Sequence, residues 1–403
     1  MSVLTEAHVI TSDAEAIAVA HELADAWRPE AADRDRERRI PREELAQLGR
    51  SGLLGITVPR AYGGAEVSMV TLAEVFRVLA AGDPAVGQVP QNHFVFVGVL
   101  IADGTPEQQA FFFDEILRGA RLGNALSERG TKHVMDMRTR LTADPSGDGY
   151  RLNGTKYYCT GALTAQWVPV FALDEADRLA VAYVERDAPG LEIDEDWTAM
   201  GQRSTISGTT RLTDVAVPAD RVVWHWRTYE RPQAFGAFGQ LLHAAIDVGI
   251  AGNALADGAA FVRERSRPWF ESGLERAADE QMVIARFGEL ATRLHAAEAL
   301  LARAGAAIDA AWADGPHGTT EETAAAASLA VAEAKAFAGE VAVEIGSELF
   351  ALAGTSATDG KYDLDRHWRN ARTHTLHDPN RWKHFHVGNW VLNGVRPPNH
   401  GLL

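Results

Sequence analysis

Three long stretches, rich in alanine and leucine and free of proline, constrain the fold of this chain most: residues 239–265, 277–313 and 320–353. Because proline ends helices while alanine and leucine favour them, each stretch predicts one long helix. Thr319–Glu322 is a capping box at the start of the third helix, and Gly354 is a natural stop after it. Long helices without a fibrous heptad pattern pack side by side, so a C-terminal four-helix bundle over residues 232–403 is predicted.

Helix-start signals also recur through the first part of the chain. Ser12, Ser68 and Thr105 each precede a run of apolar residues at helical spacing. Hydroxyl side chains at such positions satisfy the free backbone N–H groups of a helix N-terminus. Residues 1–120 are therefore predicted to form an N-terminal helical domain, in which one helix runs from Asp83 through His93.

The character of the sequence changes after Arg121, where short β-branched and aromatic runs alternate with turn residues. The runs are residues 138–142, 167–173, 179–185 and 211–217. Several short strands at this spacing are typical of an antiparallel barrel or sandwich. Residues 121–231 are therefore predicted to form a central antiparallel β-barrel, which makes the chain α+β, mostly α, with three domains.

The stretch from Tyr150 to Ala162 combines a turn signal with flanking strand formers. Asn153-Gly154 fits the two positions of a type I′ turn that need positive φ, which predicts a β-hairpin. The second strand runs into Thr160-Gly161, where a hydroxyl is followed by small residues. The local pattern alone favours an ordinary tight turn, and a place where a flat ligand lies between barrel and bundle is the alternative.

Net charge and cysteine usage limit the classes of function. The 403 residues carry a formal net charge of -16, and an acidic surface repels nucleic-acid phosphates and anionic membranes. Cys159 is the single cysteine, which excludes an intrachain disulfide and fits a reducing compartment. Residues 1–6 show no signal-peptide pattern, and no uninterrupted apolar run approaches the ~20 residues of a membrane helix. A soluble cytoplasmic protein is therefore expected.

Several nucleotide-binding and hydrolase motifs are absent from the sequence. There is no Gly-x-Gly-x-x-Gly after a strand, no phosphate-binding P-loop and no Gly-x-Ser-x-Gly elbow. Nicotinamide binding on a Rossmann unit, nucleotide hydrolysis and serine hydrolysis are therefore disfavoured.

The densest polar cluster of the chain lies at residues 364–379. Three arginines recur there every three residues and share one helix face, which suits either carboxylates of a partner helix or a phosphate. These arginines are Arg366, Arg369 and Arg372. His374 and His377 also share a face, but no HExxH motif or cysteine pair accompanies them, so no metal site is predicted.

Four further positions have both a structural and a chemical interpretation. His93 lies among apolar residues, where a lone histidine is more often a core residue than a catalytic one. Asn124 fits a turn, and Trp197 fits a cover over the barrel. Arg267 belongs to a basic group at a helix end, where interaction with the helix dipole and solvent is the simpler role. The residues by themselves leave these alternatives open.

Several blocks of the sequence, in their order and spacing, resemble the acyl-CoA dehydrogenase superfamily over essentially the whole chain. The blocks are Asn124–Glu128, Leu152–Lys156 followed by Cys159–Gly161, and Met200–Arg203 with Val215–Pro218. Other segments resemble its flavin-dependent monooxygenase branch, which includes dibenzothiophene monooxygenase and the sulfur-acquisition oxidoreductases of the SfnB type. These segments are Gln91–Phe94, Ser266–Trp269, Trp368–Pro379 and Val387–Gly394.

This resemblance implies a two-component enzyme, a homotetramer, that receives reduced FMN from a separate NAD(P)H:flavin reductase. A flavin hydroperoxide formed with O2 would then pass one oxygen atom to a small organosulfur compound in sulfur acquisition. The resemblance assigns catalysis to His93, Thr160 and Asn124. It assigns cofactor binding to Asn124, Ser127, Thr160, Trp197, Arg267 from a neighbouring subunit, Arg369 and Asn370, and the substrate pocket to His93, His377 and Trp390.

Departures from the related enzymes bear on the reaction. Acyl-CoA dehydrogenases commonly carry a glutamate base where this chain reads Leu376–Asn380, and Asp378 ahead of proline is poorly placed to remove a proton. Their Gly-Ser-Asp motif is replaced by Gly130–His133. Trp390 stands where dibenzothiophene monooxygenase has a catalytic histidine, which favours a substrate smaller than a tricyclic thiophene. An acyl-CoA dehydrogenase with FAD and a non-catalytic flavin-binding or scaffold protein are the alternative functions.

Overall fold

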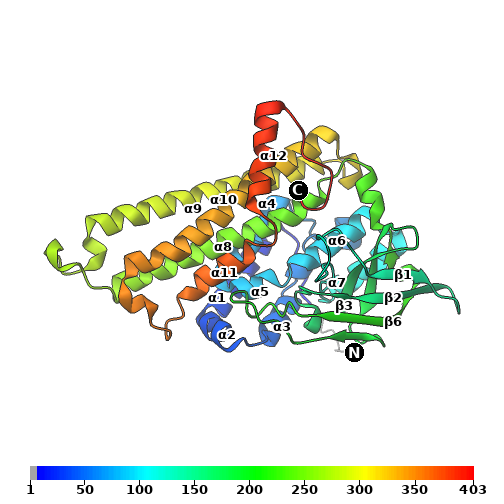
Figure 1. The fold of residues 1–403 in the computed structure, drawn as a ribbon, viewed down its shortest axis with the longest axis horizontal. Coiled ribbons are helices and arrows are strands. Elements are labelled where there is room, and N and C mark those ends of the chain that lie inside the picture. The colour runs from blue at the N-terminus through cyan, green and yellow to red at the C-terminus, as the bar shows by residue number, and fades with distance from the viewer. Residues whose placement is uncertain (1–6) are drawn as a thin grey trace.

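The computed structural model describes residues 7–403, in which helices, a sheet and further helices follow one another (Figure 1). The first group comprises α1 (Asp13–Trp27), α2 (Ala31–Glu37), α3 (Arg42–Arg50), α4 (Met69–Gly82), α5 (Pro84–Gln88), α6 (Gln91–Asp103) and α7 (Pro106–Leu117). Residues 1–6, to which the signal-peptide expectation refers, lie outside this described part.

The predicted helix starts are confirmed at three positions. The side chains of Ser12, Ser68 and Thr105 each accept a hydrogen bond from a backbone N–H in the first turn of α1, α4 and α7. The helix expected from Asp83 through His93 is interrupted. Asp83 caps the short α5, and Pro90, which has no backbone N–H to donate, separates α5 from α6.

The central part is a seven-stranded sheet with the order β5-β6-β2-β1-β3-β4-β7. Its strands are β1 (Arg140–Ala143), β2 (Gly149–Lys156), β3 (Trp167–Leu173), β4 (Leu179–Glu185), β5 (Leu191–Ile193), β6 (Thr210–Pro218) and β7 (Val222–Val223). The predicted α+β fold with a central β domain between two helical domains is confirmed. The strand pairs of its sheet are antiparallel except that β1 pairs with β3 in parallel. Within residues 7–403 the strand order also ends at β5 and β7, with no pairing between them.

The hairpin predicted at Asn153-Gly154 is wrong. Both residues lie inside β2, which pairs along its length with β6, and the register shifts between Leu152 and Gly154 as in a β-bulge. The side chain of Asn153 accepts a hydrogen bond from the backbone N–H of Asp214 on β6 at 2.8 Å. A Cβ on Gly154 would lie 2.4 Å from Oγ1 of Thr139. The Asn-Gly pair therefore serves a bulge and a close packing contact instead of a turn.

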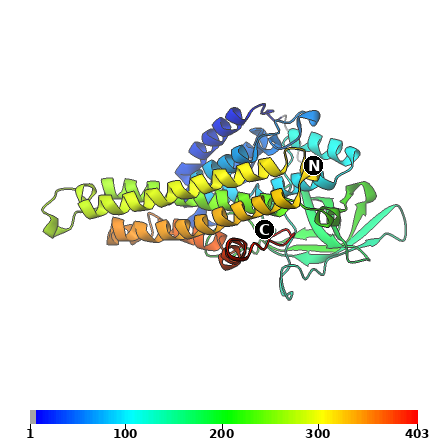
Figure 2. The ribbon, with the colours of Figure 1, turned by 90° about the horizontal axis from the view of Figure 1, so that it is seen from above.

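The third part is built on three long helices, α8 (Phe235–Glu264), α9 (Gln281–Ala311) and α10 (Glu321–Ala353), which run side by side (Figures 1 and 2). All three were predicted, and Gly354, with a φ of 81°, ends α10. The capping box of α10 joins Thr320 to Thr323, one residue later than predicted. Helix α4 packs against α8 and α9. Two shorter helices, α11 (Asp365–His374) and α12 (Asn380–Asn393), follow.

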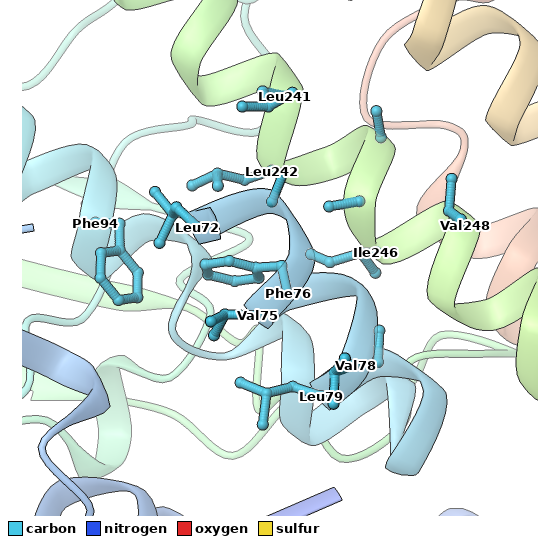
Figure 3. Packing of buried hydrophobic residues seen from close by; sticks show 14 of the residues in the cluster. Leu72, Val75, Phe76, Val78, Leu79, Phe94, Leu241, Leu242, Ile246 and Val248 are labelled. Atoms are coloured by element: carbon cyan, nitrogen blue, oxygen red, sulfur yellow. The ribbon is translucent and has the colours of Figure 1, made fainter. Parts of the chain in front are cut away.

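Apolar residues of α4, α6 and α8 meet in the main core (Figure 3). Leu72 and Phe76 of α4 and Ile246 of α8 are each 0% exposed, and Phe94 of α6 packs beside them. This contact fixes α8, which carries several polar residues of interest, relative to the N-terminal helices. By composition the stretches 84–103 and 235–264 are apolar enough to cross a membrane, which the sequence expectation did not recognise. However, 83% and 67% of their apolar windows are buried in the fold, as in core helices.

Candidate functional site

Thr160 ends a chain of buried hydroxyl groups that begins at a backbone carbonyl. The hydroxyl of Thr205 donates to the carbonyl oxygen of Gln202 at 3.0 Å and lies 2.7 Å from Oγ of Ser207. Oγ of Ser207 in turn lies 2.8 Å from Oγ1 of Thr160. Because a carbonyl only accepts, the proton of Thr205 is used towards Gln202, so Thr205 accepts a hydrogen bond from Ser207. Ser207 in turn accepts a hydrogen bond from Thr160. The lone pairs of Thr160 are therefore left to accept a hydrogen bond from another molecule.

Two amide side chains beside this turn carry unpaired atoms. Nδ2 of Asn124 donates to the carbonyl of Tyr158 at 3.0 Å, while its Oδ1 is buried without a partner. Gln202 is 1% exposed, and neither Nε2 nor Oε1 of its amide has a partner. Buried polar groups are normally hydrogen bonded. We call Asn124, Thr160, Gln202 and Ser207 the Thr160 site, and these atoms indicate that it binds a molecule with both donors and acceptors.

The backbone around the Thr160 site is strained. Tyr158, Gln202 and Ile206 have φ values of 60°, 50° and 54°. Positive φ is uncommon for residues other than glycine and most unusual for a β-branched residue such as isoleucine. Such conformations cost about 1–3 kcal/mol each and concentrate at functional sites, where the surrounding structure holds them in place.

Several residues named from the resemblance converge on the Thr160 site. Nε1 of Trp197 donates to the carbonyl of Gln202 at 2.8 Å, and Oδ1 of Asn370 accepts from the backbone N–H of Gln202 at 2.6 Å. The carbonyl of Ser127 accepts from the N–H of Tyr157 at 2.8 Å, next to the strained Tyr158. Trp197, Asn370 and Ser127 thus support the loops on which the site is built.

The expected phosphate role of Arg369 needs correction. Its guanidinium binds three carboxylates, those of Asp35 at 2.7 Å, Asp363 at 2.9 Å and Asp365 at 2.7 Å. It also donates to the carbonyl of Met200 at 3.1 Å. The arginine pattern suits either carboxylates or a phosphate, and in this structure Arg369 binds carboxylates. Arg369 therefore anchors α11 to α2 and to the loop before Gln202, and four of its five N–H donors are in use.

Arg267 is exposed in the loop between α8 and α9. Figure 2 shows that loop at the end of the long helices away from the sheet. The contact with the cofactor of a neighbouring subunit that the resemblance assigns to Arg267 stays a prediction.

His93 is a core residue in this structure. Its ring is 0% exposed, Nε2 donates to the carbonyl of Leu54 at 2.8 Å, and Nδ1 accepts from the N–H of Leu122 at 3.0 Å. Burial lowers the pKa of His93 to about 3, so the ring stays neutral near pH 7. Both ring nitrogens are occupied by backbone groups. The geometry thus speaks against the proton-transfer and pocket roles expected for His93.

His377, by contrast, lies close to the Thr160 site. Its Nε2 is 3.2 Å from Nε2 of Gln88 at the end of α5. The next residue, Val89, packs on the turn itself, since a Cβ added to Gly161 would lie 2.6 Å from its Cγ1. Gln88 is 4% exposed, and its Oε1 is a further buried atom without a partner.

Two other positions named from the sequence are Trp390, which is exposed, and Asp378, which is held in an ion pair. Trp390 is 41% exposed on α12, which stands out from the body of the molecule (Figure 1), so it is not buried with the residues above. Asp378 forms an ion pair with Lys383, whose Nζ lies 2.6 Å from Oδ2. Both side chains of this pair are less than a tenth exposed.

Sequence reasoning missed Gln88, Gln202, Ser207 and His243 as parts of this region. Gln202 lies within the Met200–Arg203 block of the resemblance, but no role was assigned to it, and Gln88 and Ser207 belong to no motif that the sequence shows. A signal did exist for His243, because His243 and Asp247 are four residues apart and so share one face of α8. His243 lies 3.2 Å from His374, measured between Nδ1 and Nε2.

Three domain models of one protein family match the chain in order. The acyl-CoA dehydrogenase N-terminal domain matches residues 13–120, the middle domain residues 123–215 and the C-terminal domain residues 241–382.

The chain is also similar over nearly its full length to characterised or named oxygenases. Dibenzothiophene monooxygenase of Rhodococcus erythropolis is 34% identical, over 96% of this chain and 95% of that protein. The probable FMNH2-dependent monooxygenase SfnC of Pseudomonas putida is 31% identical, over 97% and 98%. The crystal structure of FMN-bound TdsC from Paenibacillus sp. A11-2 superposes with a TM-score of 0.90 at 32% identity, over 96% and 100% of the two chains.

Proposed function

We propose, since this chain belongs to the acyl-CoA dehydrogenase superfamily and to its flavin-dependent monooxygenase branch, that it is the oxygenase of a two-component system. It takes reduced FMN from a separate flavin reductase and transfers one oxygen atom from O2 to a small organosulfur compound. The observation that carries this proposal is the 34% identity to dibenzothiophene monooxygenase over 96% of the chain.

The Thr160 site fits a flavin through its hydrogen-bonding groups. A flavin ring offers ring N–H donors and carbonyl acceptors on one flat edge. The unpaired Oδ1 of Asn124, the unpaired amide of Gln202 and the free lone pairs of Thr160 complement such an edge. When bound, reduced FMN supplies the electrons for the activation of O2.

The chain's own residues hold and orient the reactants. Because Thr160 offers lone pairs and no proton, it favours a group that donates a hydrogen bond, and a reduced flavin ring carries an N–H at N5 that an oxidised ring lacks. Trp197 and Asn370 fix the carbonyl and the N–H of Gln202 from two sides. In the proposed homotetramer, which we place in the cytoplasm, Arg267 of a neighbouring subunit supplies charge for the FMN phosphate.

The alternative of an acyl-CoA dehydrogenase is disfavoured by the state of Asp378. A general base needs a carboxylate within hydrogen-bond reach of the proton that it removes. The carboxylate of Asp378 is instead held by Lys383 at 2.6 Å in a largely buried ion pair. Freeing it would leave the ammonium of Lys383 buried without a counter-charge, bonded only to the carbonyl of Leu402, which is costly.

Equilibrium titration with oxidised FMN, and with reduced FMN under anaerobic conditions, tests the proposal. The wild-type protein should bind the reduced form more tightly, and the substitutions Thr160→Val and Asn124→Leu should each weaken that binding about tenfold, the value of one hydrogen bond of ~1.4 kcal/mol. Thr142→Val, at an exposed position on β1, is the matched control. Tight binding of FAD that is bleached by an acyl-CoA would instead support the dehydrogenase.

A further inference from the structure

Three histidines beside the Thr160 site form one group, which we call the histidine cluster: His243 on α8, His374 at the end of α11, and His377 just after it. One ring nitrogen from each lies within 4.8 Å of the others. His243 and His374 are buried, whereas His377 keeps an exposed edge. Through Gln88, which contacts His377 at 3.2 Å, the cluster borders the Thr160 site.

A buried ion pair lies behind the cluster. Oδ2 of Asp247 on α8 is 2.9 Å from Nζ of Lys335 on α10, and both side chains are 0% exposed. The other oxygen of Asp247 is 2.5 Å from Nδ1 of His374. Burial alone would raise the pKa of Asp247, but the adjacent Lys335 and His374 outweigh burial and hold it below its usual value. Asp247 is therefore an ionised acceptor, and Lys335 cancels its charge.

The hydrogen bonds then determine where each imidazole carries its proton. Since a carboxylate only accepts, His374 donates from Nδ1 to Asp247, and a ring that carries this one proton has its Nε2 as an acceptor. His243 donates from Nδ1 to that nitrogen at 3.2 Å. His377 donates from Nδ1 to the carbonyl of His374 at 2.6 Å. With one proton on each ring, all three therefore carry it on Nδ1. The Nε2 of His377 then accepts from the amide of Gln88 at 3.2 Å, whereas the Nε2 of His243 keeps its lone pair.

Burial and the neighbouring charges keep His243 and His377 neutral near pH 7. Burial, and then the neighbouring histidines with Lys335 and Lys383, lower the pKa of His243 well below its usual value. Desolvation of its ring by the surrounding residues, together with the nearby His374 and Lys335, lowers the pKa of His377 to about 4. Asp247 acts in the opposite direction but is outweighed. Lys383 comes from α12 and is paired with Asp378.

We propose that Asp247, neutralised by Lys335, is a positioning residue that fixes the proton positions of the histidine cluster, so that the Nε2 of His243 is left as an acceptor for a reactant. This inference rests on the proposed function, in which that acceptor orients an O–H donor such as water or an acidic sulfur compound during oxygen transfer. A carboxylate that orients a histidine in this way acts through the histidine and does not touch the reacting atoms.

Histidine-selective 13C and 15N NMR of the purified, flavin-free chain tests the positioning role directly. Signals of the cluster are assigned with the substitutions His243→Gln, His374→Gln and His377→Gln. In the wild-type chain all three rings should carry the proton on Nδ1, and His243 and His377 should stay neutral from pH 8 to about pH 5.

The double substitution Asp247→Leu with Lys335→Met removes the acceptor and the charge together, since an apolar pair of similar size commonly replaces a buried ion pair without loss of stability. The proton of His374 should then move from Nδ1 to Nε2, and the proton of His243 should also move from Nδ1 to Nε2. The maximal rate of coupled oxygenation should fall at least tenfold, with the affinity for reduced FMN unchanged. The single substitution Lys335→Met should shift the titration of His243 and His377 upward by one pH unit or more.

The matched control is the equally buried pair of Lys156 and Glu128 in the sheet domain, replaced by Lys156→Met and Glu128→Leu, which should leave the cluster tautomers unchanged. Unchanged tautomers in the Asp247 variant would overturn the positioning role. Uptake of one equivalent of Zn2+ with loss of the Nδ1–H signals would overturn it in favour of a metal site. Absence of oxygenation by the wild-type chain, with the tautomers as stated, would refute the proposed function alone.

Discussion

Replacing His93 by phenylalanine should destabilise the fold and leave the binding of reduced FMN intact. The substitution removes the acceptor of the N–H of Leu122 and the donor to the carbonyl of Leu54. Both backbone groups are then buried without a partner, at about 1–3 kcal/mol each, so the free energy of unfolding should fall by about 2–6 kcal/mol.

The loss should also depend on pH in a defined direction. The pKa of His93 is about 3 in the folded chain and about 6.5 in the unfolded chain. Between these two pH values the unfolded chain therefore binds a proton that the folded chain does not bind. The contribution of His93 to the free energy of unfolding is complete above pH 6.5 and is lost as the pH falls towards 3. Between pH 7.5 and pH 5.5 the wild-type chain should lose about 1.4 kcal/mol through this residue, and the variant should not.

Urea denaturation followed by tryptophan fluorescence at both pH values measures this difference. The gap between wild type and variant should narrow by about 1.4 kcal/mol at pH 5.5. His21→Phe, at an exposed histidine of α1, should show neither effect. A variant with wild-type stability that has lost coupled oxygenation would refute the structural role and return His93 to the chemistry.

Three further substitutions separate binding from stability. Ser207→Ala removes the hydroxyl that accepts from Thr160, so the Thr160 proton becomes free to donate. The preference for reduced over oxidised FMN should then shrink several-fold in an equilibrium titration. An unchanged ratio of the two dissociation constants would exclude the hydrogen-bond directions deduced for the three hydroxyl groups. Arg369→Met leaves the buried carboxylate of Asp363 without an ion-pair partner and Asp35 with Arg203 alone, at 3.5 Å, and should cost about 3–5 kcal/mol in urea denaturation, whereas a variant as stable as wild type that binds FMN weakly would support the phosphate role. Arg267→Ala should weaken FMN binding at unchanged melting temperature, and wild-type affinity would remove this residue from the site.

Elements defined by local composition were predictable, and the long helices show why. The absence of proline and the glycine at position 354 act within the helix itself, so α8, α9 and α10 could be placed to within a few residues. Asn153-Gly154 failed for the opposite reason. Its local preference for a turn was overridden by pairing with β6, which lies some sixty positions later in the sequence and cannot be read from the dipeptide.

The site was predictable in outline, as a turn at Thr160 that resembles a flavin motif, but its partners were not. The role of Arg369 depends on Asp35, a residue of the N-terminal helices, and periodicity alone could not choose between a carboxylate and a phosphate. The hydroxyl chain and the unpaired amides arise from loops that meet only in the folded chain. His243 and Asp247 carried a usable signal, since their spacing places both on one helix face.

Transfer of labelled oxygen tests the central claim most directly. The purified chain, a flavin reductase, NADH and FMN are supplied with heavy-isotope O2 and a panel of small sulfides, sulfoxides, sulfones and sulfinates, and the products are analysed by mass spectrometry. The account predicts that at least one compound gains one labelled oxygen atom, and that Thr160→Val reduces this gain while hydrogen peroxide release rises. Consumption of reduced FMN without any labelled product, together with oxidation of an acyl-CoA by the FAD-loaded chain, would contradict it.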